Sequence, residues 1–263
     1  MNVFAFDIET VPDTAAGARV HGLDALADQD VAAAMRAMRR ARTGGSDFLP
    51  HHLHRVAVIS IAACIGDRFR IFSLGGDGET EPAIVQRFFD GLDRYRPQLV
   101  SWNGGGFDLP VLHYRALRHG IQAPCYWESG QNERSFRWNN YLNRFHEGHL
   151  DLMDVLAGYQ LRAAAPLDEV AALCGLPGKM GMAGGDVQDA VAAGEIDAVR
   201  RYCEVDALNT YLLFLRFEYM RGHLDDSGYS AACERIRLCL SEMAESHTSA
   251  FLDAWQTQPT SEA

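Results

Sequence analysis

Four acidic residues stand in three separate patches of this chain, and two of the patches are strongly apolar. Asp7 and Glu9 lie two residues apart in an aromatic run, Asp108 follows three glycines, and Asp206 lies in a long apolar segment. Carboxylates in apolar surroundings are costly unless something compensates their charge. Hard divalent ions are the partners that carboxylate oxygens prefer, so the acids predict a metal-dependent enzyme that hydrolyses phosphodiesters.

The spacing of Asp7 and Glu9 places both carboxylates on one side of a strand. Residues i and i+2 of a strand share a face, and two like charges held close together repel each other unless a cation lies between them. An alternative is a pair of solvent-facing acids at a strand end, followed by a turn at residues 11–13.

Asp108 follows a glycine run that predicts a tight connection from a strand into a helix. The glycines at 104–106 permit positive φ, which leaves Asp108 at or near the helix N-terminus. Asn103 could anchor this turn through its side chain. The alternative role for Asp108 is an ordinary N-cap.

Tyr202 and Asp206 lie four residues apart, which places them on one face of a helix. A phenol beside a carboxylate can orient a water molecule for attack. The alternative is a partly buried tyrosine next to an exposed acid. Glu204 and Glu218 are predicted to be ordinary surface acids.

Three motifs in this order resemble the DEDD superfamily of 3′–5′ exonucleases, in its tyrosine-containing branch. They are residues 6–10 (FDIET), 103–110 (NGGGFDLP) and 202–206 (YCEVD). With residues 150–154 and 176–179, the chain is similar to a narrower, stand-alone family of predicted exonucleases related to the proofreading domain of family B DNA polymerases. The resemblance extends from about residue 2 to about residue 221.

The resemblance implies a ribonuclease H-like fold and two Mg²⁺ or Mn²⁺ ions as cofactors. Asp7 would bridge the ions, Glu9 and Asp206 would hold the ion that activates water, and Asp108 would act on the second ion. Tyr202 would orient the attacking water. The implied reaction releases nucleoside 5′-monophosphates from the 3′ end of single-stranded nucleic acid, with DNA favoured. Two alternatives stay open: an RNA-trimming enzyme, and a non-catalytic binding module of the same fold.

Several further residues are candidates for contact with the strand. They are Thr10, Asn103, Phe107, Lys179, Arg137 and Trp138. Phe107 could stack on a terminal base, and residues 134–141 interleave arginines with aromatics as a single-strand groove would. Core packing and a solvated loop are the respective alternatives. Lys179 is the only lysine in the chain.

The elements that must position these residues predict one α/β domain over residues 1–263. Strands are expected at 2–8, 55–65, 68–74, 98–102 and 149–151, and helices at 21–43, 81–95, 109–119, 195–221 and 229–255. Strands followed by interleaved and trailing helices predict a mixed five-stranded central sheet flanked by helices. The core would span about 2–221, and an extra C-terminal helix would fill about 222–257.

Composition limits the partners of the protein. The net charge of −11 opposes tight, non-specific binding to a phosphate backbone, which shifts the expected substrate toward short single-stranded ends. Replication or repair proteins are further candidate partners, and no membrane partner is expected. The sequence shows no signal-peptide pattern or membrane-spanning run, so a cytoplasmic location is expected. The six cysteines include no CxxC pair, and reduced thiols are predicted.

Overall fold

Five strands pair into one mixed sheet, in the order β3-β2-β1-β4-β5, in the computed structural model, which describes residues 2–76 and 78–257. The strands are β1 (Val3–Pro12), β2 (His54–Ile65), β3 (Arg68–Leu74), β4 (Gln98–Ser101) and β5 (His149–Asp151). β1 is antiparallel to β2 and parallel to β4, while β5 is parallel to β4. The prediction of a mixed five-stranded sheet is confirmed, and the arrangement is consistent with a ribonuclease H-like fold.

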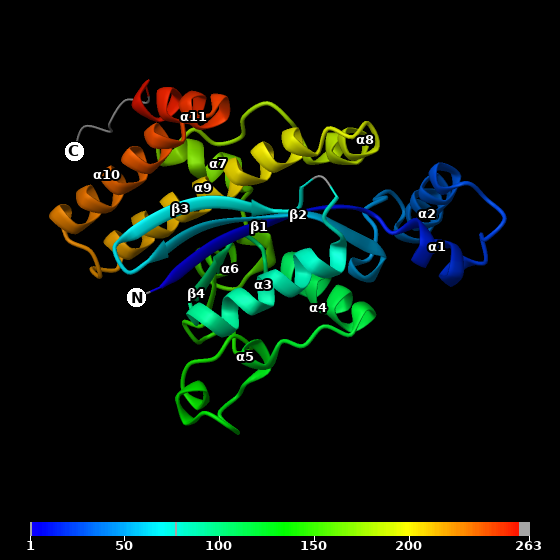
Figure 1. Cartoon of the computed structure of the whole chain (residues 1–263), viewed down its shortest axis with the longest axis horizontal. Coiled ribbons are helices and arrows are strands. Elements are labelled where there is room, and N and C mark those ends of the chain that lie inside the picture. The colour runs from blue at the N-terminus through cyan, green and yellow to red at the C-terminus, as the bar shows by residue number, and fades with distance from the viewer. Residues whose placement is uncertain (1, 77, 258–263) are drawn as a thin grey trace.

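Helices cover both faces of this sheet (Figure 1). They are α1 (Thr14–His21), α2 (Asp28–Thr43), α3 (Glu81–Tyr95), α4 (Asp108–His119), α5 (Pro124–Trp127), α6 (Leu152–Leu156), α7 (Leu167–Leu173), α8 (Val187–Ala192), α9 (Ile196–Met220), α10 (Asp226–Met243) and α11 (Ser246–Thr257). The long helix α9 lies with α10 on one face, and α3 and α4 cover the other. Among the described helices, none combines the length and apolar character needed to cross a bilayer.

Alternation along β1 decides which layer each of its side chains enters. Phe4 and Phe6 pack in the apolar cluster of α3 and α4, whereas Ala5 packs in the cluster that contains α9. Side chains two residues apart share a face, so Asp7 and Glu9 point toward the α9 layer. The central strand therefore delivers two carboxylates into the space between the sheet and its longest helix.

Two of the predicted helices have different bounds in the structure. The helix predicted at 21–43 begins only at Asp28, because Gly22 takes a φ of 68° and ends a separate helix, α1, before it. The segment at 229–255 divides into α10 and α11 because Ala244 adopts a φ of 52°. Positive φ ends a right-handed helix, and a second helix starts after each break.

Glu204 and Glu218 are buried, so the prediction of two surface acids is wrong. Glu204 accepts hydrogen bonds from Ser73 Oγ at 2.6 Å and His247 Nε2 at 2.7 Å, which ties α9 to β3 and α11. Glu218 pairs with Arg221 at 2.8 Å. Hydrogen-bonded partners compensate the burial of both acids, and those of Glu204 come from distant elements that a single sequence does not reveal.

A buried cluster of charges fixes the far end of β1 against α4. The Arg115 guanidinium, 2% exposed, contacts Asp13 and Glu81 at 2.5 Å each, and Glu81 also accepts the Val56 amide. Burial alone would raise the pKa of Asp13. The Ala16 amide and the neighbouring guanidinium groups outweigh burial and hold that pKa below its ordinary value.

Removing Arg115 is expected to destabilise the protein strongly. Arg115→Met removes the buried cation that Asp13 and Glu81 share and leaves Asp13 with only the more exposed Arg118, so the free energy of unfolding should fall by about 3–5 kcal/mol. Arg87→Met, which breaks an exposed pair with Glu79, is the control and should cost less than about 1 kcal/mol. Equal losses in urea denaturation would contradict a special role for the buried cluster.

Candidate active site

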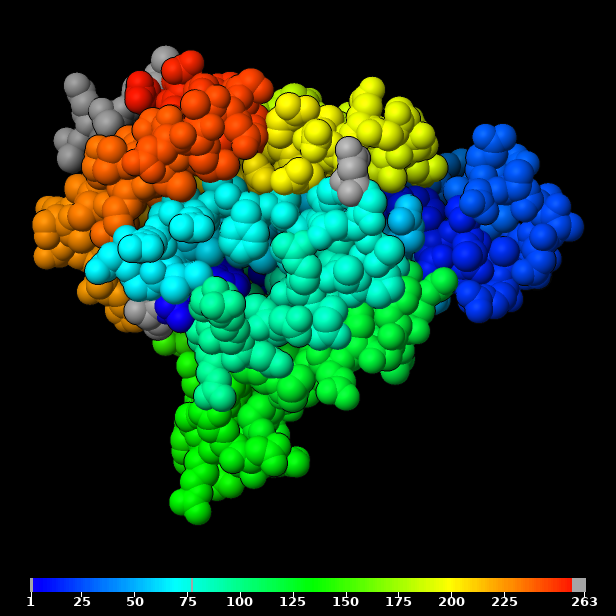
Figure 2. Space-filling model, viewed as in Figure 1, coloured from blue at the N-terminus to red at the C-terminus, as the bar shows by residue number. Residues whose placement is uncertain are grey.

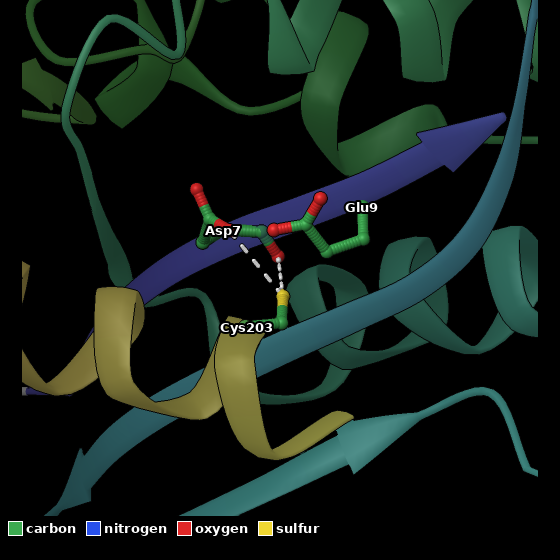
Figure 3. A group of neighbouring side chains, drawn as sticks. All are labelled: Asp7, Glu9 and Cys203. Carbon is green, nitrogen blue, oxygen red and sulfur yellow. Dashed lines mark hydrogen bonds between the residues drawn. The ribbon is translucent and has the colours of Figure 1, made fainter. Parts of the chain in front are cut away.

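Two acids of β1 and a thiol of α9 form the centre of the site (Figure 3). Ligand atoms of Asp7, Glu9 and Cys203 all lie within 4.8 Å of one another. The Cys203 thiol lies 3.3 Å from the Asp7 carbonyl oxygen and 3.4 Å from Asp7 Oδ2. The predicted shared face of Asp7 and Glu9 is confirmed, and the close packing of α9 on β1 completes the group.

Asp108 joins the group from the start of α4, and it is not the cap of that helix. The N-cap position is Phe107, while Asp108 Oδ1 accepts the Ile8 amide of β1 at 3.2 Å. This hydrogen bond spans the gap between the β4–α4 connection and the central strand. It places the Asp108 carboxylate close enough to Asp7 and Glu9 to raise the pKa of both.

The glycine-rich connection before Asp108 works by close packing, which corrects the expectation of positive φ at the glycines. Asn103 carries the positive φ, at 63°, and none of the three glycines does. A Cβ on Gly104 would lie 2.3 Å from Ser101 Oγ, and one on Gly106 would lie 2.4 Å from Asn103 Oδ1. The Asp151 carboxylate holds the connection by accepting the Asn103 amide at 2.9 Å and the Gly105 amide at 2.8 Å.

One face of α9 supplies the remaining predicted site residues. Tyr202 is 6% exposed and lies close to the Asp206 carboxylate one turn later, which contributes to its raised pKa. Burial first, and then the surrounding carboxylates, raise the pKa of Tyr202, so its hydroxyl remains protonated and acts as a donor. The four acids and Tyr202 are therefore brought together by three segments that are far apart in the sequence.

Desolvation and crowding raise the pKa of every acid in the group. Burial raises the pKa of Asp7 and of Glu9 well above their ordinary values, and neighbouring carboxylates raise both further. Burial also raises the pKa of Asp108 to about 7 and that of Asp206 to about 6. Lys179 opposes the shifts of Glu9 and Asp206. The Lys179 charge does not offset the four carboxylates, and such an excess of negative charge favours cation binding.

The residues present fit a divalent metal ion. Asp7, Glu9, Asp108 and Asp206 offer the hard carboxylate oxygens that Mg²⁺ and Mn²⁺ take. The thiol of Cys203 is a softer donor beside them, and it suits Mn²⁺ or Zn²⁺ better than Mg²⁺. Sequence reasoning missed this thiol because all cysteines were read as packing residues, although Cys203 follows Tyr202 directly and precedes Asp206 by three.

Lys179 reaches the group because α9 holds the backbone next to it. The side chain of Asn209, fully buried on α9, donates to the Gly178 carbonyl at 2.9 Å and accepts the Gly178 amide at 3.2 Å. This pair of bonds fixes the loop that presents the exposed Lys179 ammonium toward Glu9 and Asp206. Asn209 was also missed, although it lies on the same helical face as Asp206, three residues farther on.

Of the other residues predicted to contact the strand, Thr10 and Phe107 lie near the acids, whereas Arg137 and Trp138 lie far from them. The Thr10 hydroxyl bonds to His54 Nδ1 at 2.9 Å, and the Phe107 ring packs against His54. Arg137 and Trp138 are exposed, but their segment is anchored elsewhere: the Tyr141 hydroxyl bonds to the Pro97 carbonyl, before the start of β4. The acids lie toward the opposite, carboxyl ends of the parallel strands, so the structure does not bring this pair to them.

Comparison with known proteins agrees with this geometry. The model of one family, described as a predicted 3′–5′ exonuclease related to the exonuclease domain of PolB, matches residues 46–255. The chain belongs to this exonuclease family. The matched region contains Asp108, Tyr202 and Asp206, whereas Asp7 and Glu9 precede it. No curated protein matches the chain.

The raised pKa of Asp108 predicts how it affects the stability of the metal-free protein as pH changes. A carboxyl whose folded-state pKa is raised binds its proton more tightly when folded, so its contribution is present at low pH and is lost as pH rises through about 7. Through Asp108, raising the pH from 5.5 to 8 should therefore lower the free energy of unfolding, which is measured in urea with a chelator.

Asp108→Asn removes this titration and keeps an oxygen that can accept the Ile8 amide. At pH 8 it should stabilise the metal-free protein by on the order of 2 kcal/mol and flatten the pH dependence. Asp90→Asn, at an exposed acid of α3, is the control and should leave both unchanged. An Asp108→Asn protein with the same stability and pH dependence as the wild type would contradict this electrostatic picture.

Proposed function

We propose that this protein is a metal-dependent 3′–5′ exonuclease that removes nucleoside 5′-monophosphates from the 3′ ends of single-stranded DNA. The convergence of four carboxylates from β1, α4 and α9, with a buried tyrosine close to one of them, carries the proposal. Membership of a family of predicted 3′–5′ exonucleases supports the direction of attack.

Asp7, Glu9, Asp108 and Asp206 would hold two Mg²⁺ or Mn²⁺ ions. Bound ions of this kind stabilise the negative charge that develops on the attacking and leaving oxygens of a phosphodiester. The protein's own contribution is to hold four carboxylates close together without an ion. This arrangement is electrostatically unfavourable, as the raised pKa values of the four acids indicate.

Tyr202 and Lys179 would act on the water and the phosphate. The protonated Tyr202 hydroxyl, close to Asp206, can donate a hydrogen bond that orients the attacking water. Lys179 lies where a cation offsets the charge of Glu9 and Asp206, and it can do the same for a phosphate oxygen. The scissile phosphate would thus lie between the acids and the loop that Asn209 secures.

An end-labelled assay tests the activity. Wild-type protein with Mn²⁺ should shorten a 5′-labelled single strand to a ladder, and Asp7→Asn should lower the rate at least about a hundredfold because it removes a central metal ligand. Asp90→Asn is the matched control and should retain the wild-type rate. If the wild type gives no shortened products, the assignment as an enzyme is wrong and a non-catalytic binding module is favoured.

Two further substrates separate the alternatives in the same assay. A circular single strand should remain intact, because an exonuclease needs a free end, and interior cleavage would argue for an endonuclease. A matched RNA strand should be degraded more slowly than DNA. Faster degradation of RNA would replace the DNA assignment with an RNA-trimming one.

Tyr202→Phe tests the orienting role of the phenol. Loss of one donor to the attacking water should lower kcat by roughly ten- to a hundredfold, while Mn²⁺ affinity stays within about twofold of wild type. Tyr211→Phe, at a buried tyrosine on the same helix, is the control and should behave as wild type. An unchanged kcat for Tyr202→Phe would show that the phenol only packs.

A further inference from the structure

Helix α2 carries a separation of charge that the proposed catalytic site does not use. Its first turn holds Asp28 and Asp30, and its second half holds Arg36, Arg39, Arg40 and Arg42, with no acid between residues 31 and 46. The α1–α2 pair follows directly from β1 and projects from one end of the molecule (Figure 2). The helix also lies before the region matched by the exonuclease family.

Three contacts hold these arginines against neighbouring segments. Arg36 Nη2 donates to Gln188 Oε1 of α8 at 2.5 Å, which bridges two elements that border the end of β1. Arg39 Nε donates to the Phe48 carbonyl at 2.9 Å, and Arg40 pairs with Asp47 at 2.7 Å. The basic half of α2 therefore lies along residues 47–54, the segment that leads back into β2.

An aromatic contact connects this basic segment to the acids. The Phe48 ring, on a residue 54% exposed, lies 5.3 Å from the ring of Phe107, which immediately precedes Asp108. His51 and His54 pack against the same Phe107 ring. Phe48 thus offers an open aromatic surface beside the proposed cleavage site, with arginines on the adjoining helix.

Helix stabilisation explains only part of this pattern. Basic residues in a last turn favour a helix because they face its negative end, and this accounts for Arg40 and Arg42. It does not account for Arg36 and Arg39, which lie farther back, or for a large aromatic side chain left exposed. Within the described residues, Arg42 has no partner, so its charge is available to a ligand.

We propose that the basic half of α2 and Phe48 bind the single-stranded DNA that leads into the active site. The arginines would contact phosphates upstream of the 3′ end, and Phe48 would stack on a base, the combination that sequence-tolerant single-strand binding uses. The proposal rests on the proposed exonuclease function. The arginines of α2 would supply local positive charge beside the active site, which a protein with a net charge of −11 requires to hold a polyanion.

Binding without cleavage gives the first test. Anisotropy of a labelled oligothymidylate of about 12 nucleotides is measured with Mn²⁺ in an Asp7→Asn background, alone or with Arg40→Gln/Arg42→Gln. The helix variant should bind about tenfold more weakly, and its slope of log affinity against log salt should shrink by about 1.4, or about 0.7 for each lost phosphate contact.

A charge-matched control makes this test specific. Arg68→Gln/Arg70→Gln removes two exposed arginines of β3, at the other end of the sheet, and should leave affinity and slope unchanged. Equal weakening by both pairs would overturn the proposal in favour of general charge. Phe48→Ala should weaken binding without changing the slope, and an unchanged affinity would remove Phe48 from the binding surface.

Hydrolysis gives a second test that separates this proposal from the function on which it rests. For this test, Arg40→Gln/Arg42→Gln is made in a protein that keeps Asp7. The wild type should have a higher kcat/KM for the strand of about 12 nucleotides than for a dinucleotide, and the ratio of these two values should be about tenfold smaller in the helix variant. If the wild type cleaves both substrates and the helix variant has the same ratio of kcat/KM values as the wild type, the role of α2 is overturned. A wild type that cleaves neither overturns the exonuclease function, while the binding measurements still decide the role of α2. A loss of affinity for RNA but not for DNA would contradict the choice of DNA.

Discussion

Mutual repulsion among four carboxylates is the constraint around which this protein is built. Asp7 and Glu9 enter from the central strand, Asp108 from the start of α4 and Asp206 from α9, and each has a raised pKa. Groups that repel one another stay close only if the elements carrying them are fixed by other interactions. Apolar layers on both faces of β1 and the hydrogen bond from Ile8 to Asp108 provide this restraint.

The parts that the sequence predicts are those governed by local periodicity. The alternation of β1 was enough to place Asp7 and Glu9 on one face, and four-residue spacing was enough to join Tyr202 to Asp206. Contacts between distant segments could not be predicted, because no local pattern encodes the Ile8–Asp108 bond, the thiol of Cys203 beside Asp7 or the partners of Glu204. The break at Ala244 is equally hidden, since alanine rarely takes positive φ.

Charge in this protein is better understood by location than by its total. The chain is acidic overall, and part of that acidity belongs to the carboxylate group itself, where cations would offset it. Positive charge is placed selectively: Lys179 lies near the acids, Arg115 is paired in a buried cluster, and four arginines gather in the second half of α2. Local positive charge of this kind can attract an anionic ligand even to a protein that is acidic overall.

The separation of the site residues along the chain also ties activity to the order of synthesis. The Cys203–Asp7 contact joins residues 196 positions apart, and the last acid comes from a helix that ends at Met220. A growing chain emerges from its N-terminus and docks its elements in turn. No ribosome-bound fragment that lacks α9 can assemble the carboxylate group, so the nascent protein would pass through most of its synthesis with this group incomplete.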